Sequence, residues 1–326
     1  LGVSYSQGTW VITSYAVSEA IMMPLTGWLA LRFGQVRMFV AATLLFTLAS
    51  LLCGLAPNFP LLVGARVLQG VFGAAMLPLS QALMVSIYPP QKRGMALGLW
   101  IMTTILAPIV GPLVGGWLTE TFSWRWIFLI NLPFGIVVAM LSWQLLQARE
   151  SERRKLPVDY VGLILLTIGI GTLQILLDKG NELDWFASGT IIALAVTSFV
   201  ALAFFVAWEL TEEHPVVDLH LFGRGNFAIG SACLMLGSMA FFGGVVLIPL
   251  WLQTFQGYTA LWAGKVAAFG GVLSIFLSPL IGANIHRVDA RIFATIGFTV
   301  FALVSFWSSN FTPDVDYWTV ALSRLL

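Results

Sequence analysis

Long uncharged apolar runs alternate with short polar segments along the whole chain. Each run holds about 20 residues, the length that an α-helix needs to cross the hydrocarbon core of a bilayer. We therefore expect an all-α polytopic membrane protein. The pattern predicts ten membrane spans and the start of an eleventh, at residues 10–29, 38–55, 61–87, 94–118, 126–146, 160–177, 189–208, 227–255, 259–283, 292–308 and 317–326.

Lysine and arginine are unevenly distributed between the polar connections. Alternate connections hold eleven of them, while the other connections hold only Arg125 and Lys179. Because cytoplasmic loops carry the excess of basic residues, the basic connections are predicted to be cytoplasmic and the N-terminal end external. The eleven are Arg32, Arg37, Lys92, Arg93, Arg149, Arg153, Arg154, Lys155, Arg224, Arg287 and Arg291.

Composition narrows the class of function. The chain is 59% hydrophobic and 10% charged, against roughly 25% charged residues in soluble domains. Cys53 and Cys233 both fall inside predicted spans, so we expect neither a disulfide framework nor a metal site. No nucleophile–base pair or metal-ligand cluster indicates an enzyme, and no cofactor is expected. Membrane lipid is the expected surrounding, and no nucleic-acid partner is expected.

An internal repeat suggests how the chain is organised. The segment from Pro24 to Gly27 recurs at Pro279 to Gly282, and an arginine follows both. Parallel halves of this kind are common in membrane transporters. We expect an N-terminal half at 1–146 that lacks its first helix, an extra two-helix region at 147–225, and the start of a truncated C-terminal half at 226–326. The chain begins with Leu and ends within a predicted helix.

Two charged residues lie inside predicted spans. A charge near the bilayer centre costs about 2.5–3.5 kcal/mol on insertion scales, so Arg66 should face protein, where Gln69 lies three residues along the same helix face. Gly70 and Gly73 leave room for a close neighbour. Glu19 can avoid the same cost by binding a proton, as a proton carrier must. Both groups could instead be structural, with Arg66 fastening two helices and Glu19 neutral and hydrogen-bonded.

The uncharged stretch 98–117 has an unusual helix face. Pro108 and Pro112 lie four residues apart, and small residues repeat at the same spacing at Ala107, Gly111 and Gly115, with Gly116 beside them. Residues four apart share a face, so a neighbouring helix can approach closely there. The prolines each remove a helix hydrogen bond and should bend the helix. A tight structural crossing explains the same pattern without a functional role.

Two further motifs lie at the ends of spans. The segment between the first two spans carries Gly27, Arg32, Gly34 and Arg37, and we expect a tight basic turn there that pairs with acidic helix ends. It could equally be a simple cytoplasmic anchor. The fifth span opens with Trp124 and Arg125 at the interface, followed by Asn131, which needs a buried partner, and by Pro133, which permits a bend.

Taken in order, these motifs resemble one family. Gly27–Arg37, Arg66 with Gln69 and Gly70, the small-residue and proline pattern at 107–116, and the segment Trp124–Gly135 are similar to those of the 14-helix drug:proton antiporters of the major facilitator superfamily. The pattern at 107–116 resembles the antiporter motif of that group. The extra pair of spans, 160–208, also matches its helix number, and the resemblance extends over essentially the whole chain.

The resemblance implies proton-driven export of hydrophobic drugs or toxic amphiphiles across a bacterial inner membrane. It implies that Arg66, with Glu19 and Gln69 nearby, couples transport to protons, and that Gly111, Pro112 and Gly115 limit leak by holding a helix crossing. It also implies a periplasmic membrane-fusion adaptor and an outer-membrane channel as partners. The chain departs from the family at Leu31, where the loop motif has Asp, and it does not contain the first-helix Asp motif.

Two alternatives remain open from the residues alone. The same fold could export one natural amphiphile, such as a fatty acid, a siderophore or an antibiotic. A membrane sensor or scaffold that transports nothing is a different class of function, and it would need a soluble output domain.

Overall fold

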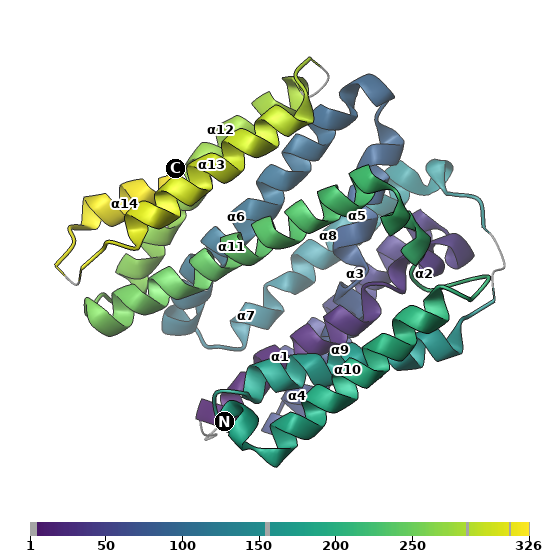
Figure 1. The fold of residues 1–326 in the computed structure, drawn as a ribbon, viewed down its shortest axis with the longest axis horizontal. Helices are drawn as coiled ribbons and strands as arrows, with labels where there is room; N and C mark the ends of the chain where they lie inside the picture. Colours follow the sequence, from purple (N-terminus) through teal and green to yellow (C-terminus); the bar gives the residue numbers. More distant parts are fainter. Residues whose placement is uncertain (1–4, 154–156, 285–286, 313, 326) are drawn as a thin grey trace. The chain divides into compact units, whose positions relative to one another are not determined.

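The computed structural model describes residues 5–153, 157–284, 287–312 and 314–325, a few of them by backbone alone. The described chain is almost entirely helical (Figure 1). Its α-helices are α1 Tyr5–Met22, α2 Thr26–Phe33, α3 Gln35–Leu55, α4 Phe59–Gly73, α5 Met76–Ile87, α6 Arg93–Thr121, α7 Trp126–Leu129, α8 Asn131–Leu146, α9 Tyr160–Lys179, α10 Gly189–Glu209, α11 Gly225–Phe255, α12 Ala260–Asn284, α13 Ala290–Ser308 and α14 Tyr317–Leu325.

The predicted spans correspond to these helices, and eight described segments are long and apolar enough to cross a membrane. Three predicted single spans are interrupted. The breaks fall after α1, α4 and α7, and each is close to Pro24, Pro78 or Pro133. Proline cannot donate the backbone hydrogen bond to the residue four positions earlier, and its ring crowds that carbonyl. Ala74 and Leu129 hold those positions for Pro78 and Pro133, at the two later breaks.

The described residues form two compact units. The first unit comprises 1–83 and 125–225, and the second comprises 84–124 and 226–326. Helix α6 therefore packs with helices of the predicted C-terminal half. The grouping into packing units does not test the division at 1–146, 147–225 and 226–326 that the repeat suggests, and that division remains a prediction.

In the first unit, α1 packs against α4 and α9, α3 packs against α4 and α8, and α9 packs against α10 (Figure 1). Close crossings are made by glycines. A Cβ atom added to Gly70 would meet the backbone of Tyr15, and one added to Gly135 would meet Thr47. The room for a close neighbour predicted at Gly70 is thus confirmed, because α1 occupies it.

In the second unit, α12 packs along α6 and also contacts α14. The crossing of α6 and α12 brings backbone next to backbone. A Cβ atom on Gly98 would meet the carbonyl of Ser278, and one on Gly282 would meet the carbonyl of Gly94. A small buried cluster formed by Leu252, Ala263, Val266 and Val320 joins α11, α12 and α14.

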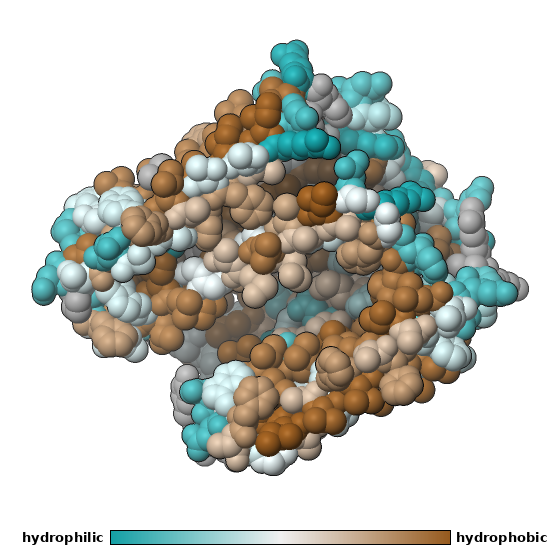
Figure 2. Space-filling view, in the orientation of Figure 1, coloured by the Kyte–Doolittle hydropathy of each residue, from teal (hydrophilic) through white to brown (hydrophobic). Residues whose placement is uncertain are grey.

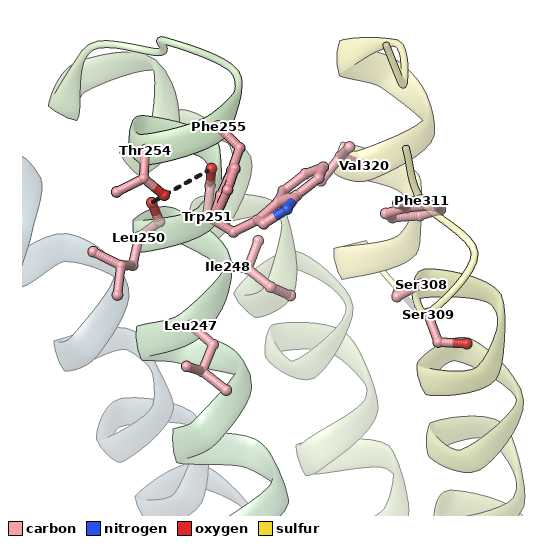
Figure 3. Close-up of a pocket in the computed structure, with 10 residues that line it drawn as sticks. All are labelled: Leu247, Ile248, Leu250, Trp251, Thr254, Phe255, Ser308, Ser309, Phe311 and Val320. Atoms are coloured by element: carbon pink, nitrogen blue, oxygen red, sulfur yellow. Dashed lines mark hydrogen bonds between the residues drawn. The ribbon is translucent and has the colours of Figure 1, made fainter. Parts of the chain in front are cut away.

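A pocket of about 650 Å³ opens at one end of α11 in the second unit (Figure 3). Trp251 and Phe255 of α11 line one wall, and Phe311 and Val320 line the other. The lining is mostly apolar, and the Thr254 hydroxyl is bound to the Leu250 carbonyl at 2.8 Å. None of the sequence-predicted site residues lies in this pocket.

Large apolar side chains cover the outer helix surfaces. Phe199 is 76% exposed, Phe306 is 74% exposed and Leu234 is 73% exposed. Figure 2 shows hydrophobic residues over much of the helix surface that faces the viewer. Contiguous exposed apolar surface of this kind is rare in water-soluble monomers. It suits helices whose outer faces contact lipid.

Candidate functional site

Arg66 of α4 is held by groups from three helical segments of the first unit. Its Nε atom donates a hydrogen bond to the Val11 carbonyl of α1 at 2.8 Å, and its Nη1 atom donates to Gln69 Oε1 at 2.5 Å. The guanidinium carbon lies 4.2 Å from the ring centre of Tyr15 and 5.8 Å from that of Phe128. Arg66 therefore faces protein, as the cost of an intramembrane charge predicts.

Gln69 connects Arg66 to α3 and α8 through hydrogen bonds. It is 2% exposed, and its Nε2 atom donates to the Ser50 hydroxyl at 2.5 Å. The Asn131 side chain of α8 donates to the same hydroxyl at 3.0 Å, so the partner predicted for Asn131 is Ser50. The Cys53 thiol lies 3.7 Å from Gln69 Oε1. One continuous polar network thus joins α1, α3, α4 and α8, which we call the arginine network.

Glu19 lies next to the arginine network. Tyr15 and Glu19 lie one turn apart on α1, and their side chains are close enough to interact. The Tyr15 ring also lies against Arg66. The charges of Glu19 and Arg66 are close enough to interact. A fixed cation, a phenol and a titratable carboxyl group therefore occupy one interior region.

Two glycines of α4 allow α1 to approach closely enough for Tyr15 to contact Arg66. On α4, Gly70 lies under the backbone of α1, and a Cβ atom on Gly73 would press on the Tyr15 hydroxyl and the Phe46 ring. A larger residue at either position would push α1 away from α4 and separate Tyr15 from Arg66. The α4 sequence can therefore hold an arginine inside the unit because Gly70 and Gly73, on the next turn, present no side chain to α1.

The segment after the first span is mostly helical, whereas the sequence predicted a tight basic turn there. Helix α2 continues to Phe33, and only Gly34, with φ of +96°, separates it from α3. This φ is readily adopted by glycine alone, which explains how one residue can reverse the chain. Gly27 and Arg32 therefore lie on a helix rather than in a loop. The Arg32 guanidinium lies 5.2 Å from the ring centre of Trp28.

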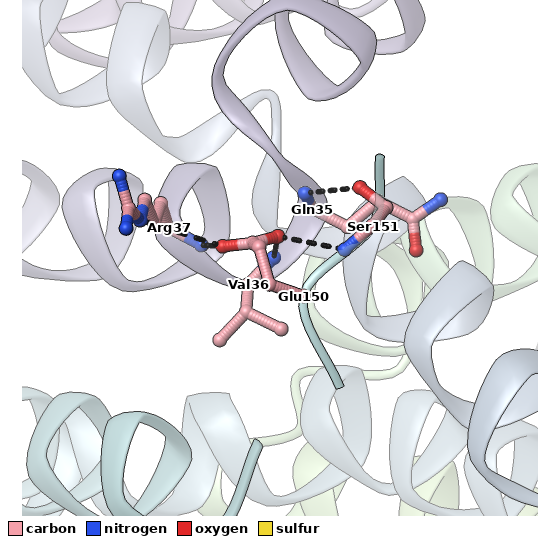
Figure 4. A network of polar contacts seen from close by, with 5 residues as sticks. All are labelled: Gln35, Val36, Arg37, Glu150 and Ser151. Carbon is pink, nitrogen blue, oxygen red and sulfur yellow. Dashed lines mark hydrogen bonds and ion pairs between the residues drawn. The ribbon is translucent and has the colours of Figure 1, made fainter. Parts of the chain in front are cut away.

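The first turn of α3 is capped by a residue far along the chain (Figure 4). The two carboxylate oxygens of Glu150 accept the backbone N–H groups of Val36 and Arg37, each at 3.0 Å. Ser151 Oγ accepts from the Gln35 N–H at 3.0 Å. The Arg37 Nε atom lies 3.8 Å from Glu150, so the expected acidic partner of this turn is present. A carboxylate here is favoured by the unpaired N–H groups and the helix dipole.

Sequence reasoning missed Glu150 and Ser151. They lie in a stretch that was interpreted only by its excess of basic residues. The Trp28 indole also donates to the Pro157 carbonyl at 3.0 Å, so the same stretch crosses α2 as well as α3. No local pattern could have predicted this pairing, because the partners lie more than 110 residues apart.

The antiporter-like motif lies within α6 of the second unit. Apart from neighbouring parts of α6 itself, no described atom of that unit lies within 4 Å of a Cβ added at Gly111, Gly115 or Gly116. The observed close crossing with α12 lies earlier on the helix, at Gly94 and Gly98. The side chains of Pro108 and Pro112 lie outside the described residues. The role predicted for this motif therefore stays a prediction.

The remaining predicted residues lie at the start of the fifth span. Trp124 is half-buried in the turn before α7, and an Nη2 hydrogen bond of 3.4 Å connects Arg125 to the Ala56 carbonyl. Pro133 lies in the first turn of α8, where its missing N–H is tolerated. Of this motif, the structure brings Asn131 into the arginine network and leaves Pro133 exposed.

Comparison with known proteins agrees with this architecture. Residues 1–325 match the family model described as Major Facilitator Superfamily. The chain is 49% identical to the multidrug export protein EmrB of Haemophilus influenzae, covering 100% of the chain and 64% of that protein. It is 49% identical to the fatty acid resistance protein FarB of Neisseria gonorrhoeae, covering 97% and 62%. It is 48% identical to EmrB of Escherichia coli, covering 97% and 62%.

The chain therefore spans a little under two thirds of the length of these relatives. A crystal structure of the peptide transporter POT, in complex with sulfate, superposes with a TM-score of 0.57 at 17% identity, covering 100% of the chain and 71% of that structure. At this identity the likeness concerns the fold alone. Family match, relatives and helical architecture agree, and the chain belongs to the major facilitator superfamily.

Proposed function

We propose that the protein exports hydrophobic drugs or toxic amphiphiles, driven by proton entry, through alternating access. The arginine network and the adjacent Glu19 carry this proposal. A membrane-embedded carboxyl group that gains a proton loses its attraction for a nearby fixed cation. Protonation of Glu19 thereby changes the contacts of Arg66, which binds α1 directly and is connected to α3 and α8 through Gln69. The similarity to proteins named multidrug export proteins supports the class of cargo.

The proton coupling is tested in the full-length protein, reconstituted into liposomes with an imposed proton gradient. Uptake of a fluorescent hydrophobic cation is measured for wild type, Arg66→Ala, Arg66→Lys and Glu19→Gln. We expect Arg66→Ala and Glu19→Gln to abolish gradient-driven transport, with partial retention in Arg66→Lys. Glu152→Gln, an exposed carboxylate in the same unit, is the matched control and should transport normally. Unchanged gradient-driven transport in both Arg66→Ala and Glu19→Gln would refute the coupling role.

A dedicated exporter of one natural amphiphile is the second candidate. One relative at 49% identity is named a fatty acid resistance protein, and this favours a fatty acid as cargo. The same liposomes can be supplied with labelled fatty acids and with structurally unrelated drugs. Transport of several unrelated drugs supports the multidrug function, while transport confined to fatty acids supports the dedicated one.

The proposed surroundings follow from this function. Export from a Gram-negative cytoplasm requires passage beyond the inner membrane, so we propose an inner-membrane location with a periplasmic adaptor and an outer-membrane channel as partners. Membrane fractionation of the full-length protein tests the location, and cross-linking in intact cells followed by mass spectrometry tests the partners. Recovery in the outer membrane would contradict the proposed location.

A further inference from the structure

Two carboxyl groups, that of the half-buried Asp159 and that of the buried Glu209, join α9 and α10 at the ends where the chain enters α9 and leaves α10. Asp159 is the N-cap of α9, and its Oδ1 atom accepts the Gly162 N–H at 2.8 Å and the Trp208 indole N–H at 3.0 Å. Glu209 is the last residue of α10 and is 0% exposed. Its Oε2 atom accepts the Val217 N–H at 3.0 Å. Each carboxylate thus uses one oxygen to hold the backbone.

The second oxygen of each carboxylate has no donor. Asp159 Oδ2 and Glu209 Oε1 are both buried and make no hydrogen bond to a donor among the described residues. Both oxygens point to the same place, because a Cβ atom added to Gly162 would collide with each of them. The two oxygens are therefore neighbours in space. Ionised carboxylates only accept hydrogen bonds, so neither can satisfy the other while both are charged.

Among the described residues, no ion pair includes Asp159 or Glu209. The further charged group that acts on Glu209 is Glu212, which is also acidic. Two like charges held together in a buried site are strongly unfavourable, whereas one shared proton removes a charge and provides the missing donor. The described groups of this site therefore fit a bound proton.

We propose that Asp159 and Glu209 form a proton-binding site, in which one proton is held between Asp159 Oδ2 and Glu209 Oε1. In the protonated pair, the shared hydrogen bond holds the start of α9 to the end of α10 and to the chain at Val217. When the proton leaves to water, both carboxylates become charged and repel each other, and this connection weakens. This site is separate from Arg66 and Glu19, and it would titrate whether or not the protein transports.

The experiment uses full-length protein in detergent micelles. Infrared difference spectra between about pH 5 and about pH 8 report the carbonyl stretch of a protonated carboxyl group. We expect part of this band to be lost in both Glu209→Gln and Asp159→Asn. Thermal unfolding is followed over the same range. We expect the wild-type melting temperature to fall by about 2–4 °C more than that of Glu209→Gln as pH rises, since glutamine donates a permanent hydrogen bond.

Controls separate this site from other titrations and from metal binding. Glu213→Gln changes an exposed carboxylate in the same connection and should keep the wild-type pH dependence. Addition of Mg²⁺ or Ca²⁺ at about pH 8 should not restore stability. The proposal is overturned if wild type and Glu209→Gln share one pH dependence and one infrared spectrum, or if a divalent cation rather than a proton stabilises the wild type. Asp159→Asn gives the same comparison if Glu209→Gln does not fold.

Discussion

Arg66 and Gln69, one turn apart on α4, form a direct hydrogen bond, and Gln69 extends it to Ser50 of α3. The glutamine amide serves as both acceptor and donor at once, so its orientation is determined by both neighbours. Removal of this one side chain would leave the Arg66 Nη1–H without its acceptor and would leave Asn131 as the donor to the Ser50 hydroxyl. The relationship therefore predicts that Gln69 matters for stability as well as for transport.

Gln69→Leu keeps the volume and removes the amide. We expect it to lower the free energy of unfolding by about 1–3 kcal/mol, because the Arg66 Nη1–H loses its acceptor and the Ser50 hydroxyl loses one of its two donors. Thermal unfolding of the full-length protein in detergent measures this. Leu68→Ala, a truncation of an exposed neighbour on the same helix, is the control and should change stability less. Equal effects of the two substitutions would show that the network does not stabilise the first unit.

Glu150→Ala removes the cap of α3. We expect a loss of about 0.5–2 kcal/mol in local stability, since the N–H groups of Val36 and Arg37 lose their acceptor. Hydrogen exchange of the peptide that covers residues 35–38 reports this directly, and exchange should become faster there than in the rest of α3. Glu152→Ala, an exposed glutamate two residues away, should leave exchange unchanged. Faster exchange in both variants would point to a general effect of charge instead.

Gly98→Val places a side chain between α6 and α12. Because the added atoms meet the carbonyl of Ser278, we expect destabilisation of about 1–3 kcal/mol. Thermal unfolding measures it. Gly264→Val is the matched control, since an added Cβ at that helical glycine meets nothing within 4 Å. If Gly264→Val destabilised the protein as much, helix propensity rather than the crossing would be the cause.

Gly111→Leu is expected to change proton leak through the protein without a large change in its thermal stability. Apart from neighbouring parts of α6 itself, no described atom of the second unit lies within 4 Å of a Cβ added there, so the melting temperature should change little. If the antiporter-like motif limits leak, proton permeability of liposomes that contain the variant should rise and gradient-driven transport should fall. If liposomes with this variant showed normal proton permeability and normal gradient-driven transport, the proposed role of this motif in limiting leak would be wrong.

The helices were predictable because hydrophobic length alone determines a membrane span. The interruptions at Pro78 and Pro133 follow from the same rule that proline lacks a donor, although the spans were predicted as unbroken. The contact between Arg66 and Gln69 was predictable from helical spacing. Its other partners, Val11 and Tyr15, depend on how α1 crosses α4, and no spacing within one helix contains that information.

Small residues show the limit of sequence reasoning most clearly. Spacing identified Gly111 and Gly115 as a smooth face, yet within the second unit the close crossing occurs at Gly98. A glycine face permits close approach but does not select the helix that approaches. The Glu150 cap was missed for a similar reason, because capping depends on a distant segment of chain.

The crossing of α6 and α12 has a mechanical consequence. At its closest points, Gly98 faces the Ser278 carbonyl and Gly282 faces the Gly94 carbonyl, so main chain meets main chain. A shift of one helix along the other would bring positions that carry side chains opposite these carbonyls. The two glycines therefore restrict both the spacing and the register of α6 and α12.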